Sequence, residues 1–270
     1  MPIVTVKQIL ECLELDPAPS GFTAQNLPIG YHRVFGGQVL AQAVVAAART
    51  VADKVPASVT ATFCREGRPE EPIGYDVQAE HDGRGFATRS VTARQGDRVI
   101  ALLTVSLVPP DTAHGFAHQT RTAPPGPPDS GDVDLVMVPF ESRLGNGVDL
   151  GSAAAEPPEL VVWMRGCDLP QDEVTQRAVL AYVTVPTLIG TALRVLDGVS
   201  VNDAYATTQT AITTHSLWLH RPIDLDGWFV LDQTAPVAAG GQAFGLGDVF
   251  DRSGFHVASY AQESVIRPTY

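Results

Sequence analysis

The chain repeats one order of apolar and polar segments in its two halves. In the first half, an alanine-rich helical stretch that starts at Phe35-Gly36-Gly37 is followed by four predicted strands: Ser58 to Arg65, Gly74 to Glu80, Phe86 to Arg94 and Arg98 to Val108. In the second half, a predicted helix from Gln176 to Leu196 precedes strands Ala211 to Arg221, Trp228 to Gln233, Gln242 to Phe250 and Phe255 to Ile266. A helix with four hairpin-linked strands forms a small layered unit, so the repeat predicts two such units whose sheets pair.

The apolar pattern within these segments indicates how the layers meet. The helical stretch after Gly36-Gly37 is apolar on nearly all sides and rich in alanine, which predicts a buried helix with a sheet wrapped closely around it. Polar and apolar residues alternate from Arg89 to Arg94, as is typical of an antiparallel strand with one solvated face. The predicted fold class is therefore α+β.

Proline and glycine divide the chain. The segment from Pro109 to about Asp132 is rich in Pro, Gly, Ser, Thr and Asp, which predicts a semi-extended linker between an N-terminal unit, 1–111, and a C-terminal unit, 133–270, with 112–132 between them. Pro186 predicts a kink or break in the second helix. Three further elements are expected, namely a short leading helix (Val6 to Leu15) and strands at Val136 to Leu144 and Leu160 to Arg165.

Composition excludes several classes of function. The net charge of −12 and the pI near 4.9 argue against a nucleic-acid partner, which needs a concentrated basic surface. No window has the ~20 consecutive apolar residues of a membrane span, and the first residues lack a signal-peptide pattern, so a cytoplasmic location is expected. The three isolated cysteines, Cys12, Cys64 and Cys167, are interpreted as packing residues. No metal site and no cofactor are predicted.

Short stretches in both halves resemble one known family. They are Arg33 to Ala43 (RVFGGQVLAQA), Asp82 to Arg89 (DGRGFATR), Leu180 to Tyr182 (LAY), His215 to Pro222 (HSLWLHRP) and Ala261 to Glu263 (AQE). As an ordered set they resemble the acyl-CoA thioesterase II family, whose members are double hotdog proteins. The resemblance implies that each sheet wraps its central helix, that the reaction is thioester hydrolysis, and that the active site lies where the two units meet.

The resemblance also shows where this chain departs from the family. Members of the family place an Asp three residues after the Leu-Ala-Tyr, and this chain has Val185 there. They place a Thr or Ser three residues before the His of the His-Ser-x-Trp strand, and this chain has Ile212. The Gln of the last strand is kept as Gln262, whereas a His found in many members aligns with Thr60.

Thioester hydrolysis without a covalent nucleophile needs a base that polarises water and donors for the developing oxyanion. Val185 cannot act as a base, and neither can Gln262, although Gln262 can hold a water or donate to an oxyanion. The free backbone amides at Gly36-Gly37 are candidate oxyanion donors, because a helix N-terminus presents unpaired N–H groups. Thr214 shares a strand face with Ile212 in a regular strand, so it is the candidate partner of Gln262.

Two readings of function stay open from the sequence. One is an acyl-CoA thioesterase in which Gln262 and Thr214 are catalytic and Gly36, Gly37 and Thr60 bind the substrate. The other is a non-hydrolytic acyl-CoA-binding or scaffold protein on the same fold. His215, expected on the opposite face, and Thr184, expected to bond its own backbone, are interpreted as structural residues. Arg65, Arg68 and Arg84 are candidates for contact with the CoA phosphates, and association into a homo-oligomer is plausible.

Overall fold

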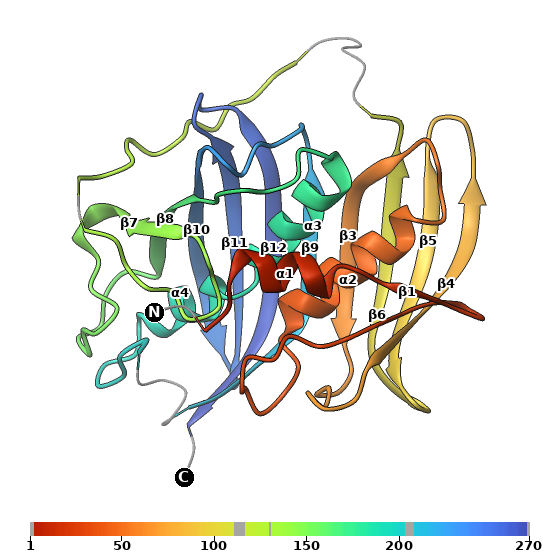
Figure 1. Ribbon diagram of the computed structural model, residues 1–270. Coiled ribbons are helices and arrows are strands. Elements are labelled where there is room, and N and C mark those ends of the chain that lie inside the picture. The colour runs from red at the N-terminus through yellow and green to blue at the C-terminus, as the bar shows by residue number, and fades with distance from the viewer. Residues whose placement is uncertain (1–2, 111–116, 130, 203–207, 269–270) are drawn as a thin grey trace.

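One curved antiparallel sheet runs through the whole molecule (Figure 1). The structure, a computed structural model, describes residues 3–110, 117–129, 131–202 and 208–268. The first half supplies strands β1 (Asp16–Ala18), β2 (Gly21–Ala24), β3 (Val55–Phe63), β4 (Ile73–Asp82), β5 (Ala87–Gln95) and β6 (Arg98–Val108). The second half supplies β7 (Glu141–Leu144), β8 (Glu159–Arg165), β9 (Thr208–Leu219), β10 (Trp228–Ala239), β11 (Gln242–Asp251) and β12 (His256–Pro268).

The strand order keeps the two halves apart and joins them at a single seam. Over the described residues the order is β1-β2-β4-β5-β6-β3-β9-β12-β11-β10-β8-β7, and every neighbouring pair is antiparallel. At the seam, β3 pairs with β9 from Ser58↔Trp218 to Thr62↔Thr214. The predicted α+β double hotdog, with two sheets side by side and a helix against each, is confirmed.

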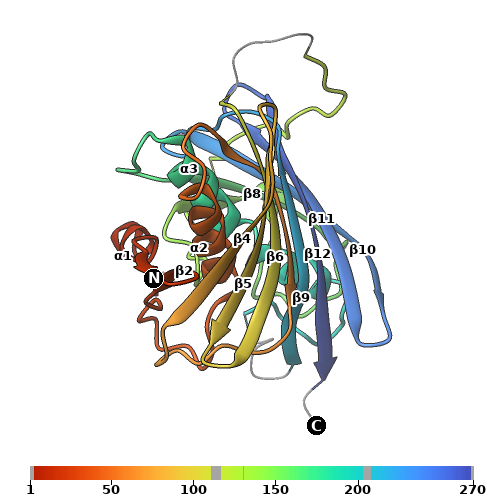
Figure 2. The same ribbon diagram turned by 90° about the vertical axis from the view of Figure 1, so that its right-hand side faces the viewer.

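The helices are α1 (Val6–Cys12), α2 (Gly36–Ala48), α3 (Glu173–Val183) and α4 (Thr187–Leu193). Figure 2 shows α1, α2 and α3 together on one side of the sheet, and α4 packs against β10 and β11. All residues of α2 after Gly36 are buried, as its apolar pattern predicts. The helix α2 packs against both the sheet and α3, and the Phe35 ring before α2 meets the Tyr182 ring of α3 edge-on, with 5.0 Å between their centroids. The two central helices therefore form one shared core.

Local chemistry explains where the helices begin and end. Thr5 and Gln8 form a capping box at the start of α1, and the Asp172 side chain accepts the Thr175 amide at the start of α3. The helix predicted from Gln176 to Leu196 breaks into α3 and α4 at Pro186, which has no amide hydrogen to continue the ladder. The predicted break is confirmed.

A few boundaries differ from the prediction. The short strands β1 and β2 were not predicted, because three or four residues are too few to show a period. The leading helix ends at Cys12 rather than Leu15, and of Val136 to Leu144 only Glu141–Leu144 is a strand. The linker has no helix or strand over residues 117–129, and its residues 111–116 and 130 lie outside the described part of the chain.

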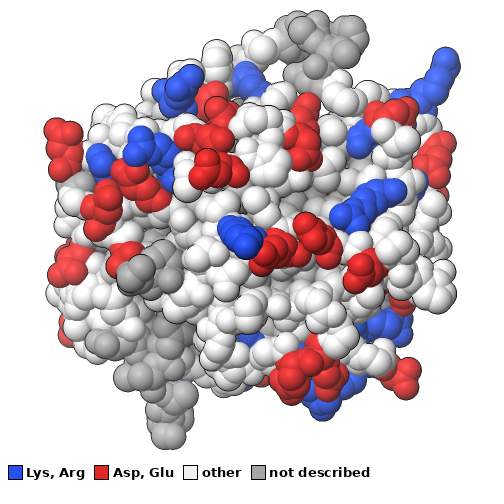
Figure 3. Space-filling view, in the orientation of Figure 1, with Lys and Arg blue, Asp and Glu red and all other residues white. Residues whose placement is uncertain are grey.

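Charged side chains of both signs are mixed on one face of the molecule, and two of the three cysteines are exposed. On the face in Figure 3, lysine and arginine are interspersed with aspartate and glutamate and form no basic patch. Among the described residues, no helix is long and apolar enough to cross a membrane, and no cluster of side chains could hold a metal ion.

Cys12 is buried, which raises its pKa to about 12. Cys64 and Cys167 are exposed, so their interpretation as packing residues is wrong, because each lies in a loop just beyond a strand.

Candidate active site

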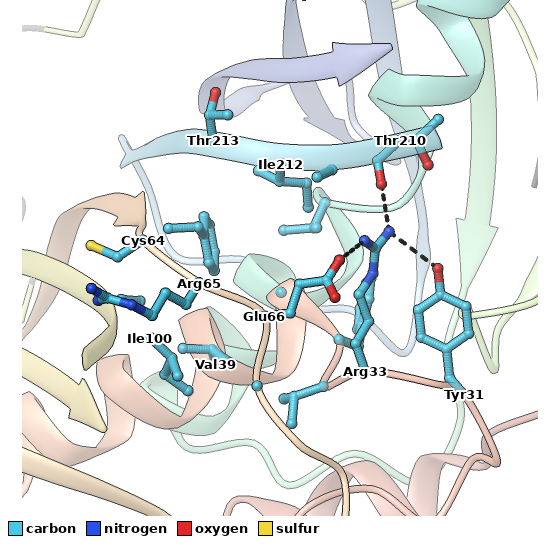
Figure 4. A pocket seen from close by; sticks show the side chains of 18 of the residues that line it. Tyr31, Arg33, Val39, Cys64, Arg65, Glu66, Ile100, Thr210, Ile212 and Thr213 are labelled. Atoms are coloured by element: carbon cyan, nitrogen blue, oxygen red, sulfur yellow. Dashed lines mark hydrogen bonds and ion pairs between the residues drawn. The ribbon is translucent and has the colours of Figure 1, made fainter. Parts of the chain in front are cut away.

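A cavity of about 280 Å³ lies where the two units meet, at the N-terminus of α2 (Figure 4). Both halves of the chain line it. The first half contributes the loop before α2, the end of β3 with the loop that follows, and part of β6. The second half contributes the break between α3 and α4 and the first residues of β9. Most of the wall is apolar and includes Phe63, Ile100, Val185 and Ile212.

The two glycines at the start of α2 have different roles. Gly36 lines the cavity, and a Cβ atom there would lie 3.2 Å from the Ile212 Cδ1 atom. Gly37 is buried behind it, and a Cβ there would lie only 2.7 Å from the Tyr182 carbonyl oxygen. Within the described chain, neither glycine amide donates to a protein acceptor, as is typical of a helix start without a capping side chain. Gly36 therefore lines the cavity with an amide that has no protein acceptor among the described residues, whereas Gly37 permits α2 and α3 to approach.

An ion pair stands at one side of the cavity. The Arg33 Nη1 atom donates to the Glu66 Oε1 atom at 2.5 Å, and Arg33 Nη2 donates to the Thr210 carbonyl oxygen at 2.5 Å and the Tyr31 hydroxyl at 3.3 Å. Burial alone would lower the pKa of the Arg33 guanidinium, but its interactions with Glu66 and Tyr31 outweigh burial and raise that pKa. Arg33 therefore connects the loop before α2, the loop after β3 and the start of β9 through a permanently charged group.

A hydrogen-bonded row of polar side chains is buried directly behind the apolar wall. His215 Nε2 lies 3.2 Å from Thr184 Oγ1, and His215 Nδ1 lies 3.0 Å from Gln262 Oε1. Gln262 Nε2 donates to Ser264 Oγ at 3.1 Å. Thr184 directly precedes Val185, and Ser264 pairs with Ile212 across the β9–β12 ladder. Gln262 is 1% exposed and does not line the cavity, so any contact of Gln262 with substrate requires a movement of this wall.

Burial in this row keeps His215 neutral. The imidazole is fully buried, which lowers its pKa to about 4, although the hydrogen bond with Gln262 acts in the opposite direction. Thr184 also contacts the Ala181 carbonyl, as expected of a hydroxyl residue at the end of a helix. The hydrogen-bonded structural interpretation of His215 and Thr184 agrees with these contacts.

A β-bulge at Thr213 changes the face on which Thr214 lies. Ser264 pairs with Ile212 and Glu263 pairs with Thr214, so Thr213 is an extra residue in β9. The extra residue places Ile212 and His215 on the inner face and Thr214 on the outer face, where its hydroxyl lies 3.3 Å from the Glu263 carboxylate. The inference that Thr214 shares a face with Ile212 is wrong for this reason, and Thr214 does not line the cavity.

Thr60 also lies on the outer face. Strand alternation in β3 directs Val59 and Ala61 inward, whereas Thr60 is exposed and its hydroxyl accepts a hydrogen bond from Ser216 at 3.2 Å. Thr60 therefore does not line the cavity, and a contact of Thr60 with substrate stays a prediction. The position that resembles a family histidine lies in β3, whose last residue Phe63 lines the cavity, but Thr60 itself lies on the outer face of that strand.

The three arginine candidates for contact with CoA lie at different distances from the cavity. Arg65 lines the cavity and donates to the Val99 carbonyl at 3.0 Å. Arg68 is paired with Glu71 at 2.6 Å. Arg84 lies in the turn between β4 and β5, at the opposite end of these strands from the cavity, because the cavity residue Ala101 is level with Ala93 and Tyr75. Of the three, the structure brings only Arg65 to the site.

The placement of Thr60 and Thr214 leads to a direct prediction. We expect Thr60→Ala and Thr214→Ala to change the free energy of unfolding by less than about 0.5 kcal/mol, because Thr60 is exposed and Thr214 is half-buried on the outer face of the sheet. The matched inner-face variant Gln262→Ala should lose about 1–3 kcal/mol, since it leaves the buried Nδ1 atom of His215 without its partner. Chemical denaturation of the three variants measures this difference. A loss in Thr214→Ala as large as that in Gln262→Ala would contradict the outer-face assignment.

Sequence reasoning missed the ion pair. Arg33 lies inside a family-like stretch that indicates only a helix entry, and Glu66 follows the strand that ends at Phe63. A charged residue directly after a strand and another directly before a buried helix were the available signals. Neither signal indicates that the two side chains meet, since the residues are separated by the whole of α2 and β3.

Comparisons with known proteins agree with this architecture. A family model described as the acyl-CoA thioesterase N-terminal domain matches residues 23–108, and one described as the C-terminal domain matches residues 114–266. Acyl-CoA thioesterase 2 of Haemophilus influenzae is 30% identical over 267 residues, which covers 91% of this chain and 92% of the relative. The mouse acyl-coenzyme A thioesterase 8 is 28% identical and covers 87% and 80%, respectively.

Solved structures give the same result. The crystal structure of an acyl-CoA thioesterase II from Mycobacterium marinum superposes with a TM-score of 0.78 at 30% identity, covering 97% of each chain. The tesB protein of Mycobacterium avium subspecies paratuberculosis superposes with a TM-score of 0.81 at 28% identity, covering 98% of this chain and 100% of the other. On the family models, the sequence identity and the shared double hotdog, this chain belongs to the acyl-CoA thioesterase II (TesB-like) family.

Proposed function

We propose that this protein hydrolyses acyl-CoA to a free carboxylic acid and CoA in the cavity at the N-terminus of α2. The observation that supports this best is the make-up of the cavity: an apolar wall from both units meets an unpaired helix amide and one charged pair. An acyl chain fits the apolar wall, and the thioester carbonyl needs a hydrogen-bond donor. Family membership supports the same reaction.

Each part of the cavity has a role in this proposal. The amide of Gly36 donates to the thioester oxygen as it becomes negative, and the N-terminal end of the α2 dipole strengthens this bond. Phe63, Ile100 and Ile212 contact the acyl chain and exclude bulk water. Arg65 lies at the open side, where its charge suits an anionic part of CoA.

The assignment of Gln262 to the reaction stays a prediction. Its amide is held by His215 and Ser264, so in this structure it positions the wall rather than contacting the cavity. We propose that it acts through this row, by fixing Ile212 and Val185 against the acyl chain. A loss of affinity with an unchanged turnover number in Gln262→Ala would agree with positioning, whereas a fall in turnover number alone would indicate direct participation.

The central test of the function is release of free CoA thiol from acyl-CoAs of several chain lengths. We expect release above the uncatalysed rate for at least one of them. The non-hydrolytic alternative predicts measurable binding of the same acyl-CoAs without any release, and no observation favours it. Absence of both release and binding across the panel would contradict the proposed function.

The two exposed cysteines allow the location of the site to be tested in the same protein. Cys64 lines the cavity, whereas Cys167 lies in the loop after β8 and does not line it. Saturation with a non-hydrolysable thioether analogue of acyl-CoA should slow alkylation of Cys64 and leave Cys167 unchanged, as measured by mass spectrometry of the labelled peptides. Equal labelling of Cys64 with and without the analogue would place the ligand elsewhere.

A cytoplasmic location and association of two or more copies of this chain, both expected from the sequence, stay predictions. Fractionation of cells that produce the protein tests the first, and light scattering of the purified protein tests the second.

A further inference from the structure

Hydrolysis in this cavity requires a group that takes a proton from water, and the wall offers few candidates. Val185 and Ile212 are apolar, and the neutral His215 is buried behind them outside the cavity. Among the described residues that line the cavity, the one carboxylate is Glu66. Carboxylates serve as general bases toward water in hydrolytic enzymes when they lie within reach of the attacked carbon.

Glu66 is held in position yet remains open to water. Its carboxylate oxygen Oε1 accepts a hydrogen bond of 2.5 Å from Arg33, whose side chain is only 17% exposed and is itself fixed by the Thr210 carbonyl and the Tyr31 hydroxyl. The Glu66 side chain is 59% exposed. One oxygen is therefore anchored, and the second, Oε2, has no protein partner among the described residues and can accept a hydrogen bond from a water molecule.

The Glu66 carboxylate lines the same cavity as the other groups that the proposed reaction needs. Figure 4 shows Glu66 and Arg33 directed toward one another at the edge of the cavity, next to the apolar wall that includes Ile212 and Val39. Gly36, whose amide has no acceptor within the described part of the chain, lines the same cavity. A base and an oxyanion donor that line one cavity can act on opposite sides of a carbonyl group, as hydrolysis by water requires.

We propose that Glu66 is the general base of this enzyme and that Arg33 is its positioning residue. This inference rests on the proposed function. Glu66 takes a proton from water while the water oxygen forms a bond to the thioester carbon, and the electron pair of the C=O bond moves to the oxygen. When the tetrahedral intermediate collapses, the C–S bond breaks and the CoA thiolate receives the proton from Glu66. The products are a carboxylic acid and CoA thiol.

The direct test is the turnover number of Glu66→Gln in the full chain, measured by thiol release. Glutamine keeps an oxygen that accepts from Arg33 but cannot take a proton, so we expect the turnover number to fall by ~10²-fold or more. Glu71→Gln is the matched control, because Glu71 is in the same loop, pairs with Arg68 at 2.6 Å and does not line the cavity. The control should retain the wild-type turnover number, and both variants should keep the wild-type unfolding temperature.

A second variant separates catalysis from a structural role. In Glu66→Ala, added formate should restore part of the lost rate, because a small carboxylate can occupy the space left by the side chain. A wild type that releases CoA thiol while Glu66→Gln retains its rate would overturn the role of Glu66 and leave the proposed function standing. A wild type without release would overturn both.

Discussion

Replacing Gly37 with alanine should destabilise the protein by about 3 kcal/mol, although alanine is the better helix former. The new methyl group would lie 2.7 Å from the Tyr182 carbonyl oxygen and 2.5 Å from the Phe35 ring. The ring can rotate, but the carbonyl belongs to the backbone of α3, so α2 and α3 would have to move apart. Because both helices share one buried core, that movement opens gaps along their whole contact.

Gly36→Ala is the matched control for this prediction. A Cβ there would meet the Ile212 Cδ1 atom at 3.2 Å and the Phe63 ring at 3.4 Å, and both belong to side chains next to an open cavity. We expect a change in the free energy of unfolding of less than about 1 kcal/mol. Denaturant unfolding of both variants decides the matter. Equal stability of Gly37→Ala and Gly36→Ala would contradict the close contact between α2 and α3 at Gly37.

The second large effect should come from acid. Burial lowers the pKa of His215 to about 4 in the folded protein, below its ordinary value near 6.5. The unfolded chain therefore binds a proton between these two values while the folded protein does not. The stability that depends on neutral His215 is complete above pH ~6.5 and is lost progressively as the pH falls to ~4, with a total on the order of 3 kcal/mol.

Other groups also titrate in this range, so the measurement is a difference between two proteins. The free energy of unfolding is measured from pH 7 to pH 4 in the wild type and in His215→Gln, where glutamine can hydrogen-bond but cannot gain charge. We expect the wild type to lose about 3 kcal/mol more than the variant over this range. Replacement of the exposed His32 controls for the loss of a surface histidine. Parallel curves for the wild type and His215→Gln would contradict burial of a neutral His215.

Much of the fold could be predicted because its signals are local. The apolar stretch after Gly36-Gly37 indicated a buried helix, alternation from Arg89 to Arg94 indicated a strand with one solvated face, and Pro186 indicated the break between α3 and α4. Each of these depends on a residue and its near neighbours in the sequence. The elements that were missed, β1 and β2, are too short to show a period.

The candidate site was harder to predict because its residues meet only through tertiary contacts. Glu66 is exposed and lies in a loop, so it has no periodic pattern that would mark it as part of a cavity. The proposed role of Glu66 depends on Arg33, which precedes α2 in the sequence. It also depends on the Thr210 carbonyl, which belongs to the second half of the chain and holds Arg33. The family-like stretches indicated the correct region, but they drew attention to the positions that depart from the family rather than to a new carboxylate.

The sequence by itself determined the order of elements, the duplication into two hotdog units and the family. It also determined that apolar Val185 and Ile212 stand where the family has polar residues, because those identities hold whatever the packing. Only the tertiary structure decided which side chains face the cavity. Strand alternation assigns faces reliably while a ladder is regular, but the bulge at Thr213 arises from the pairing of β9 with β12, and it moved Thr214 to the outer face and His215 to the inner one. A residue's face is thus a property of the paired sheet, which distant parts of the chain create together.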